Sequence, residues 1–233
     1  MVSAPFVIRY DFSLPGPREV AFELKLDPVT LLNRAPVPDD VPAWAKLSCK
    51  QCNNCPLREA DSPTCPVAGQ LIDVVELFAG MVSFEMVAVR VTVPERTYER
   101  HDVPVQVALS SLLGLYMVTS GCPVLAHLRP LVRFHLPFAS ELETITRAVS
   151  MHLLEQYLRG QRGEVADWSL EGLSKAYEAT GAVNVAFAQR LRTAAPKDAN
   201  VNALIRLDTF ARAMPDTIES RLDELAFLFP KRA

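Results

Sequence analysis

The chain has 233 residues, of which 49% are hydrophobic and 22% charged, and its formal net charge is -3. This balance is typical of a globular protein that buries a sizeable core, and it excludes a disordered or fibrous chain. Because Lys and Arg are spread along the chain without a basic run, neither nucleic acid nor a membrane surface is expected as a partner.

Three segments have sequence patterns typical of β-strands. Residues 6–13 (FVIRYDFS) place apolar side chains on every second position, and residues 20–26 (VAFELKL) repeat the pattern after a Pro/Gly turn. Residues 84–93 (FEMVAVRVTV) are rich in Val, which favours a third strand. The sequence therefore predicts an N-terminal hairpin and one further strand.

The residues after about position 104 follow helical patterns. Residues 105–118 are mostly apolar, and the SELE of 140–143 is a capping box in front of a longer amphipathic helix. Asp198 and Asp216 occupy positions typical of N-caps, which predicts helices over 199–213 and 217–229.

The predicted fold class is α+β, with a small antiparallel sheet (the N-terminal hairpin plus one strand) packed on a mainly α-helical body. No linker divides the chain convincingly, so we expect a single domain over 1–233. Within it, the hairpin and a cysteine-rich knuckle occupy 1–66 and the helical body occupies 67–233.

The N-terminal residues, MVSAPFVIRYDF, lack the basic segment and long apolar run of a secretory signal. The apolar segment 105–118 is shorter than the roughly 20 residues of a membrane span, so it is interpreted as a core helix. We therefore expect a cytoplasmic protein. In that reducing compartment, clustered cysteines bind metals or act in redox chemistry more often than they form disulfides.

Four of the five cysteines lie in the segment 48–67, SCKQCNNCPLREADSPTCPV. Their spacing, C-x2-C-x2-C-x9-C, allows neighbouring thiols to chelate one ion across a tight turn. Cys65 and the distant Cys122 are each followed by Pro-Val. Since Pro favours the first position of a helix, both cysteines are predicted to be N-caps, where free amides stabilise a thiolate.

The preferred ligand set is Cys52, Cys55, Cys65 and Cys122, which would form a closed, structural four-sulfur zinc site. Cys49 is an alternative to Cys122 as the fourth ligand. The same spacing also fits a 4Fe-4S cluster, because three close thiolates and one remote cysteine can hold its four corners. A third interpretation is that the cysteines are reduced and bind no metal.

A second candidate site is the segment LRPLVRFHLPFASE, residues 128–141, which places Arg129, Arg133 and His135 just before the capped helix. Two arginines and an imidazole near a helix N-terminus could hold a small anionic ligand. The alternative is a structural connection in which His135 bonds to a backbone carbonyl.

The blocks CNNCPL, CPVA, SSLLG, TSGCP and RFHLPFASELET resemble those of a bacterial protein family of unknown function. The resemblance extends from the YDFSL strand to the LDELAFLF segment near the C-terminus. Its blocks match Cys52, Cys55, Cys65 and Cys122, whereas Cys49 lies outside them. It implies no activity.

Two classes of function follow from these observations. The first is a metal-binding protein with a structural site, acting through binding or regulation on an unidentified protein or a small anion. The second is an iron-sulfur or redox protein, or an enzyme, in which Cys122 reacts or binds a cluster while Arg133 and His135 bind substrate. No nucleotide-binding, nucleophile-elbow or metalloprotease motif is present in the sequence.

Overall fold

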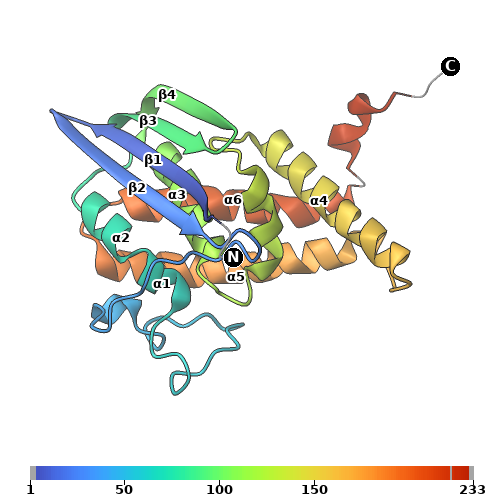
Figure 1. Ribbon diagram of the computed structural model, residues 1–233, viewed down its shortest axis with the longest axis horizontal. Helices are drawn as coiled ribbons and strands as arrows, with labels where there is room; N and C mark the ends of the chain where they lie inside the picture. Colours follow the sequence, from blue (N-terminus) through green and yellow to red (C-terminus); the bar gives the residue numbers. More distant parts are fainter. Residues whose placement is uncertain (1–3, 221, 231–233) are drawn as a thin grey trace.

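A four-stranded antiparallel sheet is formed by chain segments before and after the cysteine-rich segment 48–67 (Figure 1). The computed structural model describes residues 4–220 and 222–230. The strands are β1 (Phe6–Leu14), β2 (Arg18–Leu26), β3 (Met86–Val93) and β4 (Arg96–Pro104), in the order β2-β1-β3-β4. The sheet thus draws strands from both predicted parts of the chain.

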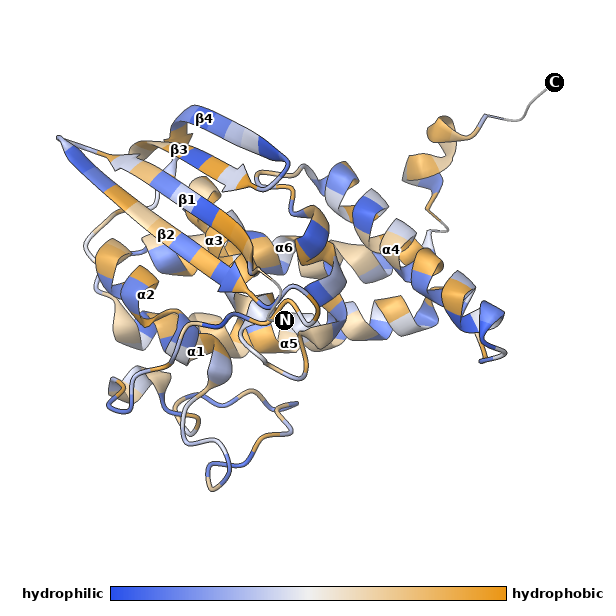
Figure 2. Ribbon diagram, in the orientation of Figure 1, coloured by the Kyte–Doolittle hydropathy of each residue, from blue (hydrophilic) through white to orange (hydrophobic). Residues whose placement is uncertain are grey.

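One face of the sheet is buried and the other carries charged side chains. In β1, Tyr10 lies between Phe22 of β2 and Val91 of β3, and all three are buried. On the opposite face Arg9 pairs with Asp11 at 2.7 Å. Figure 2 shows the resulting alternation of hydrophobic and hydrophilic positions along the strands.

The predicted sheet is confirmed, with β4 as an additional strand. Its sequence, RTYERHDVP, has mostly exposed side chains and pairs only with β3, so it is an edge strand. Charged side chains on an edge strand discourage pairing with another chain. They also interrupt the alternation of apolar residues from which a strand is predicted, so β4 was not predicted as a separate strand.

The remaining elements are helical. The α-helices are α1 (Pro66–Gln70), α2 (Ile72–Phe78), α3 (Val105–Thr119), α4 (Glu141–Gln161), α5 (Glu171–Ala194) and α6 (Ala199–Glu219). Short 3₁₀ helices are η1 (Ala43–Ala45), η2 (Ala126–Phe134) and η3 (Asp223–Leu228).

The main hydrophobic core lies between the buried face of the sheet and α3, with α6 packed on α3 and α5 packed on α6 (Figure 1). Helix α3 is buried on several sides, including Leu109, Leu112 and Leu113 with no exposed surface, so the predicted core helix is confirmed. Within the described residues, no helix is both long and apolar enough to cross a bilayer.

A second hydrophobic cluster is formed by α4 together with parts of α5 and α6. The predicted capping box starts α4: the Ser140 side chain accepts a hydrogen bond from the Glu143 amide, and the Glu143 carboxylate accepts one from the Ser140 amide. Leu128 of η2 packs against both clusters and so connects them.

The prediction of two separate helices over 199–213 and 217–229 is wrong. Helix α6 continues through Pro215 to Glu219, and only η3 follows. Met214 and Thr217 on either side of this proline are buried, so packing offsets the hydrogen bond that Pro215 cannot make. Asp198 does precede α6, but its carboxylate binds the amide and hydroxyl of Ser83.

Candidate metal centre

Residues 48–65 form a loop, called here the cysteine loop, whose two ends are tied together. Lys46 and Thr64 form an isolated antiparallel bridge, and the Leu47 amide donates to the Pro63 carbonyl at 2.8 Å. The Cys65 amide donates to the Ala45 carbonyl at 3.0 Å. The first three cysteines are therefore carried by a loop with a fixed base.

Four cysteines from three separate parts of the chain line one small cavity. Cys52 and Cys55 come from the interior of the cysteine loop, Cys65 from the end of that loop where α1 starts, and Cys122 from the turn between α3 and η2. This cavity, called the thiol cavity, has a volume of about 20 Å³. Cys49 does not line it. The structure thus brings together the four cysteines that were preferred from the sequence.

The thiol cavity is not a finished coordination shell. Across residues 4–220 and 222–230, no three or more His, Cys, Asp or Glu side chains are arranged closely enough to hold a metal ion as they stand. All five cysteines are free thiols, each partly buried. The four thiols would have to close inward to reach the roughly 2.3 Å of a zinc–sulfur bond.

Cys65 is the N-cap of α1, as predicted. Pro66 takes the first helical position, and the Cys65 carbonyl accepts a hydrogen bond from the Gly69 amide at 2.8 Å. Its side chain makes no capping hydrogen bond, so the thiol is left free to face the thiol cavity.

The prediction that Cys122 is also an N-cap is wrong. The following helix, η2, starts only at Ala126 and is a 3₁₀ helix. Pro130 within η2 cannot donate a backbone hydrogen bond, which disfavours an α-helix here. Instead the chain turns near the sulfur, and the backbone amides of Leu125 and Val124 act to lower the pKa of the Cys122 thiol.

A buried arginine on α5 forms part of the wall of the thiol cavity. Arg190 is only 2% exposed, and its guanidinium donates to three backbone carbonyls. Nη1 bonds to the carbonyls of Trp44 and Lys46 at 2.6 Å each, and Nη2 bonds to that of Leu47 at 3.3 Å. Arg190 takes part in none of the ion pairs formed by the described residues, so no carboxylate balances its charge.

Arg190 was missed by the sequence analysis, which treats charged residues on a helix as exposed. One signal was present. Arg190 lies at helical spacing from Val183 and Phe187, which are both buried residues of α5. A charge within an apolar stripe indicates a buried partner or a functional role.

Burial sets the protonation of the thiols. Burial, and secondarily the thiols of Cys65, Cys122 and Cys55, raises the pKa of the Cys52 thiol to about 11, while Arg190 opposes the rise. Burial also raises the pKa of Cys122, against the lowering effect of the Leu125 and Val124 backbone amides. Cys52 is therefore a neutral thiol at neutral pH until something replaces its proton.

The three residues of the second candidate site have different partners within the chain. Arg133 is exposed, pairs with Glu95 at 2.7 Å and lies over the Phe6 ring with 4.7 Å between its Cζ and the ring centroid. Arg129 donates through Nε to the Val118 carbonyl at 3.4 Å. These two side chains do not share a partner.

His135 points into the protein. Its Nε2 lies 2.6 Å from the hydroxyl of the buried Tyr10. Burial, and secondarily the charge of Arg147, lowers the pKa of His135 from 6.5 to about 3, so at neutral pH the imidazole is neutral. Anion binding by Arg129, Arg133 and His135 stays a prediction, and the geometry gives each residue a structural partner.

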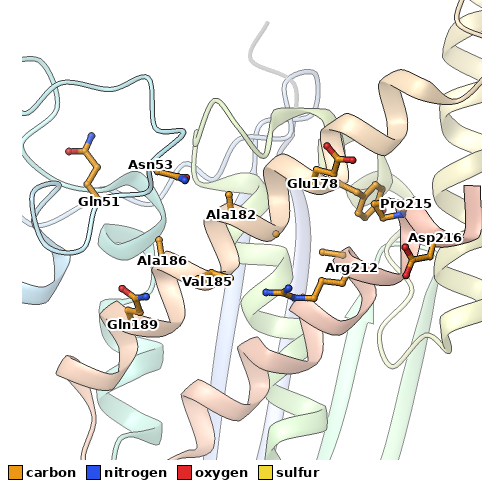
Figure 3. Close-up of a pocket in the computed structure, with 13 residues that line it drawn as sticks. Gln51, Asn53, Glu178, Ala182, Val185, Ala186, Gln189, Arg212, Pro215 and Asp216 are labelled. Carbon is orange, nitrogen blue, oxygen red and sulfur yellow. The ribbon is translucent and has the colours of Figure 1, made fainter. Parts of the chain in front are cut away.

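A larger groove lies beside the cysteine loop. This loop groove has a volume of about 820 Å³, with Gln51 and Asn53 on one side and Gln189 of α5 and Arg212 of α6 on the other (Figure 3). The Asn54 side chain donates to the Ala179 carbonyl of α5 at 2.9 Å. The cysteine loop is therefore both one wall of the thiol cavity and one wall of the loop groove.

Comparison of the chain with curated proteins and with solved structures gave no match. A family model described as "Domain of unknown function (DUF6901)" matches residues 8–230, which is nearly the whole chain. The chain therefore belongs to the DUF6901 family.

Proposed function

We propose that Cys52, Cys55, Cys65 and Cys122 bind a single zinc ion in a closed, structural site. The observation that carries this proposal is the convergence of four thiols from three chain segments on one cavity beside the unbalanced charge of Arg190. A closed site with four protein ligands has no position for water or substrate, so its role is to stabilise the fold.

Charge balance supports metal binding over four unliganded thiols. A buried cation without an anionic partner is costly, and the thiols of the metal-free cavity supply no negative charge while they are protonated. Four thiolates around a divalent zinc ion have a net charge of -2, which Arg190 and the amides at Cys122 would partly neutralise. Arg190 thus suits a tetrathiolate site.

The size of the thiol cavity favours zinc over a 4Fe-4S cluster. A volume of about 20 Å³ is close to that of one water-sized probe, which suits a single ion. A four-iron cluster with its four sulfides would need a much larger space. The cluster is therefore the second candidate, and it predicts a coloured protein.

The metal would fix the cysteine loop against α5 and so shape the loop groove. Gln51 and Asn53 line that groove and flank Cys52, one of the proposed ligands. This arrangement suits a cytoplasmic protein that acts through binding or regulation, with the metal holding one wall of its binding surface.

The proposal is tested by metal analysis of protein purified without oxygen or added chelator. We expect a colourless protein with one equivalent of zinc, and X-ray absorption at the zinc edge should report four sulfur neighbours at about 2.3 Å. A brown protein containing iron and sulfide would favour the cluster. A folded protein without stoichiometric metal, or zinc with nitrogen and oxygen ligands, would contradict the four-cysteine site.

A further inference from the structure

A second, smaller cavity lies between α5 and α6, apart from the cysteines. This α5–α6 cavity has a volume of about 150 Å³ and is largely apolar, with Val185, Leu204 and Ile205 among its lining. Asn184 also lines it, although the residue is only 2% exposed. The Asn184 side chain makes no hydrogen bond with any described residue, which is unusual for a buried amide.

Asp208 on α6 supplies a second unsatisfied group to the same cavity. Its Oδ2 accepts a hydrogen bond from Arg212 Nε at 2.7 Å. Its Oδ1 is buried and has no hydrogen-bond partner among the described residues. Gly181 of α5 leaves room next to this oxygen, since a Cβ built there would lie 4.0 Å from Oδ1.

We propose that the α5–α6 cavity binds a primary alkylammonium group. Its N–H groups would donate to Asp208 Oδ1, which gives that buried acceptor a partner, and to the Asn184 amide oxygen. Its alkyl chain would lie against Val185 and Ile205, which are 42% and 43% exposed at this surface. This site is separate from the thiol cavity.

The volume limits the length of the ligand. About 150 Å³ corresponds to roughly five water molecules at about 30 Å³ each, which matches a chain of four carbons ending in an ammonium group. Arg192 also lines the cavity but is exposed, so solvent screens its charge more than that of the Asp208 carboxylate, whose side chain is 19% exposed. A lysine side chain and a free diamine both have this chemistry.

The test uses the protein as purified, with its metal, and follows backbone amide signals by NMR. The probes are Nα-acetyl-lysine N-methylamide, which represents a lysine of a partner chain, and putrescine, which represents a free diamine. Tetramethylammonium has the charge without N–H donors and is the negative control. We expect saturable shifts in residues 184–189 and 204–208. Tighter binding of the lysine derivative would indicate a lysine of a partner chain as the ligand, and tighter binding of putrescine would indicate a free diamine.

Two variants and one matched control decide the assignment. Asp208→Asn should weaken binding about tenfold or more, because a charge-assisted hydrogen bond is lost. Gly181→Ala should also weaken it, since the new methyl group covers Oδ1 at an ordinary contact distance. Asp216→Asn removes the same charge from an exposed position on the same helix and should leave the affinity unchanged.

Three results would overturn the proposal. One is the absence of saturable shifts with both amines, which would mean that the cavity does not take up an alkylammonium group. Another is equal weakening by Asp208→Asn and Asp216→Asn, which would indicate a diffuse charge effect. The third is binding of tetramethylammonium as tight as that of the amines. Because none of these variants alters a cysteine, failure here leaves the metal site unaffected.

Discussion

The guanidinium of Arg190 and the thiol of Cys52 line the same cavity, and the positive charge of Arg190 favours the thiolate form of Cys52. Arg190 belongs to α5, whereas Cys52 belongs to the cysteine loop. The same guanidinium holds the backbone of residues 44–47, which leads into that loop. One side chain therefore fixes the position of the loop and supplies charge to its thiols.

Replacement of Arg190 should affect both roles. Arg190→Met removes the donors to three carbonyls and should lower the free energy of unfolding by about 3 kcal/mol or more, because those acceptors stay buried. It should also weaken metal binding, since no positive charge then faces the thiolates. Chemical denaturation and a competition titration with a zinc chelator measure the two effects.

Arg190→Lys separates the two roles. Lys keeps the charge but lacks the planar fork that reaches several carbonyls at once. We therefore expect metal affinity closer to that of the unaltered protein than in Arg190→Met, with stability still reduced. Equal metal affinity in Arg190→Met and the unaltered protein would contradict an electrostatic role.

Removal of the metal should loosen the cysteine loop while the sheet stays intact. The base of the loop is held by the Lys46–Thr64 bridge and by Arg190, but its interior is linked to the body chiefly by Asn54 and the cysteines. Hydrogen exchange before and after chelation should show lost protection in residues 48–65 and little change in β1. Uniform loss of protection across the whole chain would indicate that the metal controls global folding instead.

Acidic pH should destabilise the protein through His135. Because burial lowers the folded-state pKa of His135 to about 3, the unfolded chain binds a proton below pH 6.5 that the folded chain does not. The stability present above pH 6.5 is therefore lost as the pH falls towards 3, by up to about 1.4 kcal/mol per pH unit.

His135→Gln should remove this part of the pH dependence, because the amide oxygen can accept from the Tyr10 hydroxyl without titrating. His101→Gln, at a side chain that is 74% exposed, is the matched control and should leave the pH profile unchanged. Urea denaturation at several pH values gives the change in unfolding free energy with pH for each variant. Identical slopes in His135→Gln and the unaltered protein would refute the assignment.

The anion site predicted at Arg129, Arg133 and His135 can be tested through Glu95. The Arg133–Glu95 pair is about half exposed and should contribute less than about 1 kcal/mol, but Glu95 occupies the guanidinium that an anion would bind. Glu95→Gln should therefore increase the rise in melting temperature caused by inorganic phosphate, and Arg133→Ala should abolish it. If Glu95→Gln shows no such rise, the segment is a structural connection.

Most of the fold follows from patterns of period two and 3.6 in the sequence. The alternation at Tyr10 and Phe12 predicted β1, and the Ser140–Glu143 capping box predicted the start of α4. Edge strand β4 and the continuation of α6 through Pro215 depend on tertiary packing, which overrides local propensity. They could not be predicted from local sequence alone.

The convergence of the four cysteines was predictable in part. The C-x2-C spacing predicted that Cys52 and Cys55 lie together. The Cys-Pro sequence predicted that Cys65 lies at the start of a helix. The turn around Cys122 and the carbonyl contacts of Arg190 arise from segments far apart in the sequence. Neither has a local pattern, which is why the sequence analysis missed the arginine.

The ligand set itself is tested most directly by two variants that each replace one cysteine. Zinc content and melting temperature are measured for both. We expect Cys122→Ser to lose the metal and to melt at a lower temperature, because a structural metal contributes directly to folding free energy. Cys49→Ser, the matched control, should keep one equivalent of zinc, since Cys49 does not line the thiol cavity. Loss of zinc in Cys49→Ser together with full retention in Cys122→Ser would contradict the proposed site and assign the metal to the four cysteines of residues 49–65.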